Sequence, residues 1–154
     1  LLSCGGSSNK NAAELWNDGQ KYRAENKLRE SITSYKTILV KYPSDNFSAE
    51  AQFQIADIYL NDVKDFDFAV KKFQKVVDLY PNHEVSKKSL FMIAYIFNNY
   101  LNAYSEAIIT YKLFRKKYPN DELIPSVEFE LDGLKDIQST IDSLNSIVNK
   151  KSNI

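Results

Sequence analysis

Few residues in this chain could do chemistry, and the first of them is Cys4 in the opening stretch LLSCGGSS. Cys4 is the only cysteine, so it cannot form a disulfide within the chain. The single histidine, His83, lies in a polar loop where we expect it to be solvated. Neither residue has companions at a spacing that could hold zinc or pair a nucleophile with a base. For Cys4 this leaves an incidental thiol or an attachment point for lipid.

Three carboxylates in the stretch DVKDFD, those of Asp62, Asp65 and Asp67, are the next candidates, because aspartates in a loop can bind calcium. The stretch lacks the glycine and the terminal glutamate of a calcium loop, so we interpret it as a solvated turn. A glycine-rich loop that could hold phosphate is absent from the sequence as well. The sequence therefore predicts no catalytic residue, metal site, cofactor or small-molecule substrate, and a protein that is not an enzyme.

The composition favours a single helical domain. A chain of 154 residues is long enough to bury a hydrophobic core, and only four Gly and four Pro among many Leu, Ile, Ala, Glu and Lys are typical of helices. Lys plus Arg equals Asp plus Glu at 20 each, which disfavours nucleic acid as a partner. Apolar runs stay well short of the roughly 20 residues of a membrane-spanning helix. Any contact with a membrane is therefore expected to come from a lipid anchor.

The dipeptide Tyr-Pro recurs with a spacing of 38 residues, at 42–43, 80–81 and 118–119. Four other series share this spacing: Leu28, Phe66 and Tyr104; Ser31, Ala69 and Ala107; Tyr35, Phe73 and Tyr111; and Ile38, Val76 and Phe114. A fixed period of 20 to 50 residues is the signature of a repeat architecture. Apolar residues fall on one helix face on each side of a polar turn at residues 61–67, and Pro81 stops the second helix. Each unit is therefore predicted to be a helical hairpin, with small and large residues alternating where its helices meet.

The unit resembles the tetratricopeptide repeat (TPR). The family pattern appears in the second repeat as Phe53, Ile55-Ala56, Tyr59, Ala69, Phe73, Val76 and Pro81, in the third as Phe91, Ile93-Ala94, Phe97, Ala107, Tyr111, Phe114 and Pro119, and more loosely in the first as Trp16, Gly19, Tyr22, Ser31, Tyr35, Ile38 and Pro43. The resemblance implies an all-α fold, an α-solenoid of about three TPR hairpins plus a C-terminal capping helix or helices. Longer helix starts after YPSD, YPNH and YPND resemble those of bacterial envelope lipoproteins, the BamD-like subunit of β-barrel assembly and the YbgF/CpoB-like coordinator of the Tol-Pal system.

The repeats divide the chain into segments. The expected boundaries are 1–3 for a signal-peptide remnant, 4–11 for a lipidated cysteine and flexible tether, 12–135 for the TPR domain (repeats at about 12–43, 46–81 and 84–119 and a partial one at 122–135), 136–150 for an amphipathic helix and 151–154 for a tail. In the last helix an apolar seam steps by three and four residues along Leu134, Ile137, Ile141, Leu144 and Val148. This helix either folds back over the last repeat or forms a coiled coil with a second copy or a partner.

Aromatic residues recur at one position in the first helix of each unit: Trp16, Phe53, Phe91 and Phe129. In TPR proteins this position commonly faces a concave groove where peptides or helices dock, so the resemblance implies a partner-binding groove. Leu60, Asn61, Tyr95, Asn98 and Asn99 would share that surface and add amide groups that can bond a peptide backbone. The alternative is that the rings pack within their own hairpins.

The stretch from Leu1 to Cys4 resembles the end of a bacterial lipobox, with leucine three residues before the cysteine and a small residue just before it. The resemblance implies cleavage before Cys4, acylation, and an outer-membrane lipoprotein that faces the periplasm. The expected function is a non-enzymatic scaffold that binds other envelope proteins or peptides, in outer-membrane protein assembly or else in Tol-Pal or cell-wall coordination. A cytoplasmic TPR adaptor with a misread N-terminus is the remaining alternative.

Overall fold

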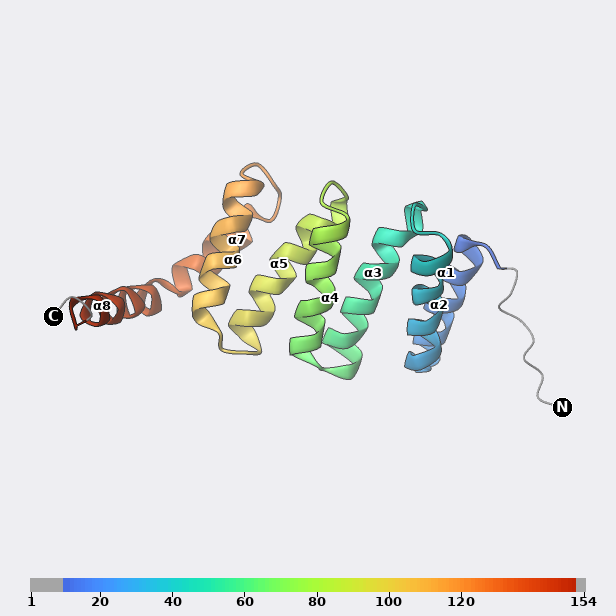
Figure 1. Cartoon of the computed structure of the whole chain (residues 1–154), viewed down its shortest axis with the longest axis horizontal. Coiled ribbons are helices and arrows are strands. Elements are labelled where there is room, and N and C mark those ends of the chain that lie inside the picture. Colours follow the sequence, from blue (N-terminus) through green and yellow to red (C-terminus); the bar gives the residue numbers. More distant parts are fainter. Residues whose placement is uncertain (1–9, 152–154) are drawn as a thin grey trace. The chain divides into compact units, whose positions relative to one another are not determined.

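The computed structural model describes residues 10–151 and divides the chain into two compact units, one ending at Val85 and one beginning at Ser86. Both units are helical throughout, and the described residues form eight α-helices and one short π-helical turn (Figure 1). The all-α solenoid that the sequence predicts is confirmed. Within residues 10–151, none of the helices combines the length and the apolar character needed to cross a membrane. Cys4 lies outside the described residues.

The helices form hairpins that follow the repeats. The first unit contains α1 (Ala12–Ala24), α2 (Leu28–Lys41), α3 (Asn46–Ile58), the π-helical turn η1 (Tyr59–Val63) and α4 (Phe66–Leu79). The second unit contains nearly all of α5 (Glu84–Asn99), followed by α6 (Tyr104–Lys117), α7 (Ile124–Gly133) and α8 (Lys135–Lys151). We call α1, α3, α5 and α7 the helices A, and α2, α4 and α6 the helices B.

The Tyr-Pro pairs end each helix B in one backbone conformation. Tyr42, Tyr80 and Tyr118 have φ/ψ of −132°/50°, −128°/50° and −131°/59°. Three residues later a side chain caps the next helix: Asp45 Oδ1 accepts from Phe47 N at 2.9 Å, His83 Nδ1 from Val85 N at 3.3 Å, and Asp121 Oδ1 from Leu123 N at 3.0 Å. Such acceptors satisfy N–H groups that a helix start leaves unpaired. The prediction that His83 is simply solvated is therefore wrong, because its ring caps α5.

Within each hairpin, a residue in the left-handed conformation reverses the chain. Asn26, Lys64 and Asn102 have φ of 58°, 61° and 52°, and each lies two residues before a helix B. This conformation is uncommon outside glycine, so its recurrence at one repeat position marks a conserved geometry of the turn. The polar turn predicted over residues 61–67 is shorter than expected, because η1 extends the helix to Val63 and α4 already begins at Phe66.

The closest approach of two helices is between α1 and α2. A Cβ atom on Gly19 would lie 2.6 Å from the ring of Tyr35, so only glycine fits there without movement of that ring. The Ser31 hydroxyl donates to the Gly19 carbonyl oxygen at 2.7 Å, which is possible because the backbones are so close. The predicted alternation of small and large residues is visible in the core, where the following are all fully buried: Ser31, Tyr35, Ala69, Phe73, Ala107 and Tyr111.

The junction between α7 and α8 differs from the hairpin turns. Leu134 is the only residue between the two helices, and its φ/ψ of −97°/2° is not left-handed. The first turns of α8 contact α6, with Lys112 Nζ donating to Gln138 Oε1 at 3.1 Å. Farther along, α8 leaves α6 and α7 (Figure 1), and residues 142–148 are exposed. The helix therefore does not fold back over the last repeat along its length.

Candidate functional site

In the first unit, the aromatic residues predicted to line a groove pack against other rings. Trp16 stacks on Phe47 with ring centroids 5.4 Å apart and tilts against Tyr35 at the same distance. Phe53 meets Phe73 edge-on at 5.3 Å. Trp16 and Phe53 are both half-buried, so part of each ring stabilises the core and the remainder is accessible.

In the second unit, Phe91 and Phe129 differ sharply in burial. Phe91 is half-buried; it stacks on Tyr95 with centroids 6.3 Å apart and meets Tyr111 edge-on at 5.8 Å. Phe129 is 78% exposed, because α7 has no helix B whose ring could cover it. Of the four predicted groove rings, Phe129 is therefore the most open to a partner.

The other predicted groove residues divide into buried and accessible ones. Leu60 is only 4% exposed, so its side chain belongs to the core and offers no surface to a partner. Asn61 and Asn99 are exposed near the ends of their helices A. The Asn61 amide donates to Asp57 Oδ1 at 2.8 Å, and that of Asn99 to the Tyr95 carbonyl oxygen at 3.1 Å. These two amides are within reach of a docking chain.

A charged network that the sequence analysis missed joins α1 to α3 and η1. The guanidinium of Arg23 bonds Asp57 Oδ2 through Nη2 at 2.6 Å, Asp62 Oδ2 through Nε at 2.9 Å and Gln54 Oε1 through Nη1 at 3.0 Å. All three charged side chains are 23–30% exposed, so water screens the network only in part. With two carboxylates for one guanidinium, the cluster keeps a net negative charge.

A simpler contact occupies the equivalent place in the second unit. Asn98 Nδ2 of α5 donates to Glu130 Oε2 of α7 at 2.7 Å. Asn98 follows Arg23 by two repeats, and Glu130 follows Gln54 by two repeats. The repeat period was therefore the signal that could have found Arg23, since it maps the predicted residue Asn98 back onto that position.

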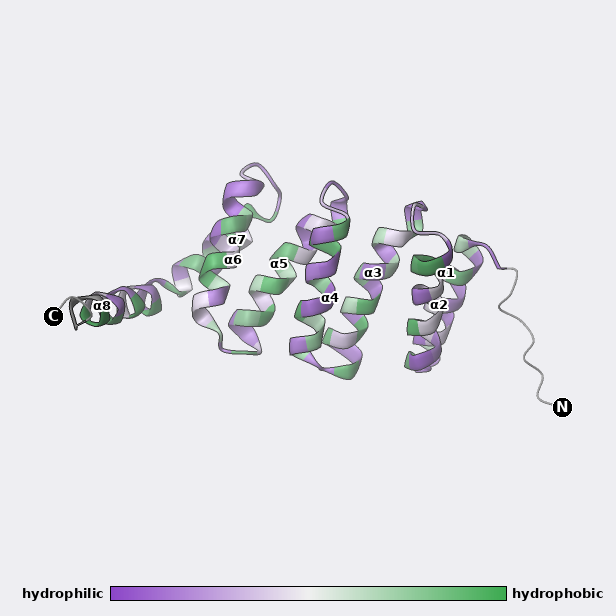
Figure 2. Cartoon of the chain, viewed as in Figure 1, coloured by the Kyte–Doolittle hydropathy of each residue, from purple (hydrophilic) through white to green (hydrophobic). Residues whose placement is uncertain are grey.

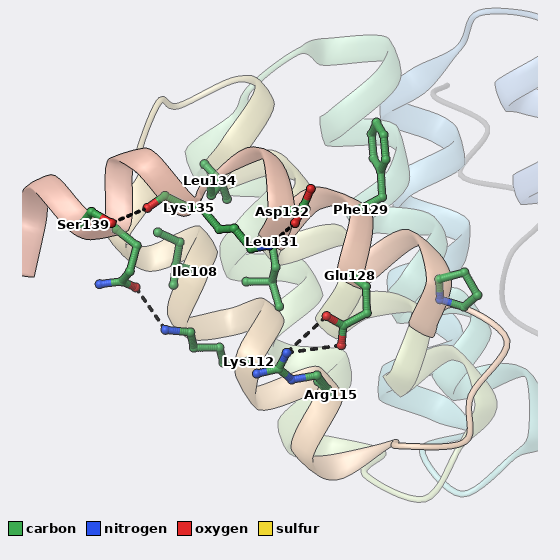
Figure 3. Close-up of a pocket in the computed structure, with 12 residues that line it drawn as sticks. Ile108, Lys112, Arg115, Glu128, Phe129, Leu131, Asp132, Leu134, Lys135 and Ser139 are labelled. Carbon is green, nitrogen blue, oxygen red and sulfur yellow. Dashed lines mark hydrogen bonds and ion pairs between the residues drawn. The ribbon is translucent and has the colours of Figure 1, made fainter.

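A hollow of about 750 Å³ lies between α6, α7 and the start of α8. Its walls include the apolar side chains of Ile108, Leu131 and Leu134, and polar pairs cross its rim (Figure 3). Arg115 Nη1 of α6 contacts the Glu128 carboxylate of α7 at 3.2 Å. The hollow thus has an apolar interior beside a charged edge, as a binding site for a protein segment requires.

A second hollow, of about 400 Å³, brings two predicted groove residues together. Asn98 and Phe129 both line it, next to Glu130 and Ile137. In Figure 3 the Phe129 ring points away from the Arg115–Glu128 pair. Phe129 lines both hollows, so a partner could contact this ring from either one.

The electrostatics of α7 are acidic. The helix carries Glu128, Glu130 and Asp132 and no basic residue. Burial, with a smaller effect of the nearby Glu130 carboxylate, raises the pKa of the Tyr111 phenol, which therefore stays neutral. This surface is consequently suited to ligands that bring positive charge or hydrogen-bond donors.

The aspartates of the DVKDFD stretch do not converge on a metal. Asp62 pairs with Arg23, Asp65 Oδ1 accepts from Phe68 N at 3.0 Å and so caps α4, and Asp67 is exposed. The prediction of a solvated turn is wrong for the first two, whose carboxylates have partners. Across residues 10–151, no three His, Cys, Asp or Glu side chains are grouped so that they could hold a metal ion.

Comparison with known proteins gives one family. Residues 3–126, well over half of the chain, match the family model described as Soluble NSF attachment protein, SNAP. This segment contains every hairpin from α1 to α6 and the start of α7. The match fits a TPR-like helical-repeat protein, as the sequence predicts. No curated protein matches the chain at a significant level.

Proposed function

Since the chain belongs to the soluble NSF attachment protein (SNAP) family, a TPR-like helical-repeat family of adaptor type, we propose that its helices A bind a protein partner of the bacterial cell envelope. Membership itself makes the chain a helical-repeat scaffold for protein interaction. The family is named for attachment to a protein, NSF. The proposal adds where the partner binds, what chemistry it brings, and where in the cell the scaffold is held.

The observation that supports the binding surface is the exposure of Asn61, Asn99 and Phe129 on helices A. The other rings of the series, those of Trp16, Phe53 and Phe91, are committed to the core on one side. An exposed ring can anchor a partner in a hollow, and exposed amides can bond an extended backbone.

The charge of these helices indicates the kind of partner. The Arg23 cluster keeps a net negative charge, and α7 contributes three carboxylates without a basic residue. Opposite charge on a partner favours its encounter and its orientation. We therefore expect a peptide or helix that carries Lys or Arg beside an apolar residue that contacts Phe129.

Site-specific photo-cross-linking in the native host tests the surface. A cross-linking residue replaces Asn61 or Asn99 in turn, and the matched control replaces Val40, which is 80% exposed on α2, a helix B. The two helix-A positions are expected to capture the same protein and the control to capture none of it. Equal capture from Val40, or no capture from the helices A, would contradict the proposal.

A substitution of Phe129 tests the anchor without touching the core. Phe129→Ala is expected to weaken capture about tenfold, since truncation of an anchor residue costs upwards of about 1 kcal/mol of binding energy. Leu113→Ala on the exposed surface of α6 serves as the control. A captured subunit of the β-barrel assembly machinery would support the leading role in outer-membrane protein assembly, and a Tol-Pal or cell-wall protein would support the second.

The membrane part of the proposal depends on Cys4 and has its own test. Two or three acyl chains on this cysteine would hold the scaffold at the outer membrane, because each buried methylene contributes about 0.8 kcal/mol. Labelling with a palmitate analogue should mark the wild-type protein and not Cys4→Ser. An unlabelled wild-type protein recovered from the soluble fraction would refute the anchor, while the cross-linking result would still stand or fall separately.

A further inference from the structure

The fourth hairpin of the chain has a helix A without a helix B. In the second and third hairpins, Phe53 and Phe91 meet the buried rings of Phe73 and Tyr111 on the helix B of the same hairpin. Phe129 of α7 occupies the corresponding position and is 78% exposed. The missing contact is therefore the one that a helix B would make.

The sequence of α8 carries the pattern of a helix B. Each helix B has a large residue, a small one three positions later, a large one four after that, and an apolar one three after that: Leu28, Ser31, Tyr35 and Ile38; Phe66, Ala69, Phe73 and Val76; Tyr104, Ala107, Tyr111 and Phe114. In α8 the same spacing gives Ile137, Thr140, Leu144 and Ile147. Yet Leu144 and Ile147 are more than half exposed, whereas Tyr35, Phe73 and Tyr111 are fully buried. Figure 2 shows hydrophobic and hydrophilic residues alternating along α8.

The short junction explains why α8 does not pack on its own α7. The three complete hairpins have turns of two to four residues, and each turn contains a left-handed residue: Asn26, Lys64 and Asn102. Between α7 and α8 there is only Leu134, and neither it nor Gly133 is left-handed. An antiparallel helical hairpin needs a loop of about two to five residues, so this junction cannot reverse the chain.

The place for the missing helix is open. The hollow of about 750 Å³ between α6, α7 and the start of α8 has the apolar residues Ile108 and Leu131 in its wall, and Phe129 at its side (Figure 3). The acidic helix α7 would run antiparallel to an incoming helix whose last turn is basic, and the sequence of α8 ends in two lysines. Shape, apolar pattern and charge thus agree with α8 as the occupant.

We propose that two copies of the chain exchange α8, so that each copy supplies the helix B of the other's fourth hairpin. The chain thereby completes with a second copy the hairpin that its short junction prevents it from completing alone. Exchange is reciprocal and the interface is isologous, so assembly stops at a dimer. Leu144 of one copy would contact Phe129 of the other, as Phe73 contacts Phe53 within its own hairpin. This inference does not depend on the lipid anchor or on the partner of the helices A.

The oligomeric state is the first test. Light scattering of the full chain should give a dimer, and Leu144→Asp combined with Ile147→Asp should give a monomer. The matched control, Val40→Asp with Leu79→Asp, changes two exposed aliphatic residues of the first unit and should leave the dimer intact. A wild-type chain that stays monomeric up to about 100 µM, well above the micromolar affinities of ordinary interfaces, would overturn the proposal.

Disulfide trapping tests the arrangement, with Cys4→Ser in every variant. When Phe129→Cys is mixed with Leu144→Cys, we expect a disulfide between the two chains, and none when Asp142→Cys, on another face of α8, replaces Leu144→Cys. Insertion of Gly-Asn-Gly between Gly133 and Leu134 should lengthen the junction and convert the dimer to a monomer. A dimer that persists after the insertion and forms no Phe129–Leu144 cross-link would refute the exchange in favour of a simple coiled coil.

Discussion

The first and the second unit solve the same structural problem with different chemistry. In the first, Arg23 joins α1 to α3 and η1 through Gln54, Asp57 and Asp62. In the second, Asn98 joins α5 to α7 through Glu130 alone. The positions are equivalent in the repeat, so the backbone geometry sets where neighbouring helices A are joined, and the side chains decide how strongly.

This difference makes the first unit sensitive to electrostatics. A guanidinium between two carboxylates forms charge-assisted bonds that are strong when partly shielded from water and weaker at high salt. An amide that donates to one carboxylate forms a single bond and leaves no charge unpaired when it is lost. The comparison can be tested by exchanging or removing the residues that distinguish the two units.

Removal of Arg23 should have the largest effect. Arg23→Ala leaves Asp57 and Asp62 close together without a cation, and we expect the free energy of unfolding of the first unit to fall by about 2–3 kcal/mol. Asn98→Ala in the second unit should cost about 1 kcal/mol. Urea unfolding at low and at high salt measures both, and the cost of Arg23→Ala should shrink as salt rises. Equal costs, or a salt-independent one for Arg23, would contradict the comparison.

A change at the closest helix contact should come second. Gly19→Ala places a Cβ 2.6 Å from the buried ring of Tyr35, and overpacking of this kind should lower stability by about 2 kcal/mol despite the better helix propensity of alanine. The matched exchange, Ala94→Gly in the second unit, should cost about 1 kcal/mol through helix propensity. Thermal or urea unfolding distinguishes them. A stabilised Gly19→Ala variant would show that Tyr35 can move aside.

Acid should weaken the second unit through its helix cap. The Leu123 backbone N–H, followed by Lys87 at 2.9 Å, lowers the pKa of the Asp121 carboxyl below its ordinary value. A lowered folded-state pKa means that the contribution is complete above the unfolded-state pKa of about 4 and is lost as pH falls through the folded-state pKa. Asp121→Ala should cost about 1 kcal/mol at neutral pH. Urea unfolding from pH 7 to pH 2 should show a flatter acid-side loss in this variant, and an unchanged profile would refute the assignment.

The smallest effect should be a gain. The hydroxyl of Tyr111 is buried and finds no hydrogen-bond partner among the described residues, whereas the equivalent residue of the second hairpin is Phe73. Tyr111→Phe should therefore raise stability by up to about 1 kcal/mol. The reverse change, Phe73→Tyr, should lower stability by a similar amount, because it buries a hydroxyl. Differential scanning calorimetry measures the pair, and a loss of stability in Tyr111→Phe would point to a polar partner for this hydroxyl.

The repeat made most of the fold predictable. A spacing of 38 residues, the apolar periodicity and Pro81 together indicated helical hairpins whose first and last residues lie near those observed. The length of the turn in the second hairpin was less accessible, because a lysine in the left-handed conformation at position 64 and a π-helical turn before it follow from tertiary packing and leave no local signal.

The candidate site was predictable only in part. The aromatic series was correctly placed on helices A, but its spacing could not reveal that Phe53 and Phe91 lean on a helix B while Phe129 does not, because that depends on whether the chain can turn after α7. Arg23 was missed because its carboxylate partners lie 34 and 39 residues away, beyond the range of a helical pattern.

The shared backbone conformation at Tyr42, Tyr80 and Tyr118 has a consequence for engineering the chain. A segment cut after one of these tyrosines and ended at the next has matching dihedral angles at both ends, so it behaves as an interchangeable module. Residues 43–80 could be duplicated in place, and the added hairpin would join its neighbours without a designed linker. The protein can therefore be lengthened in steps of one repeat, which would extend its binding surface by a known increment.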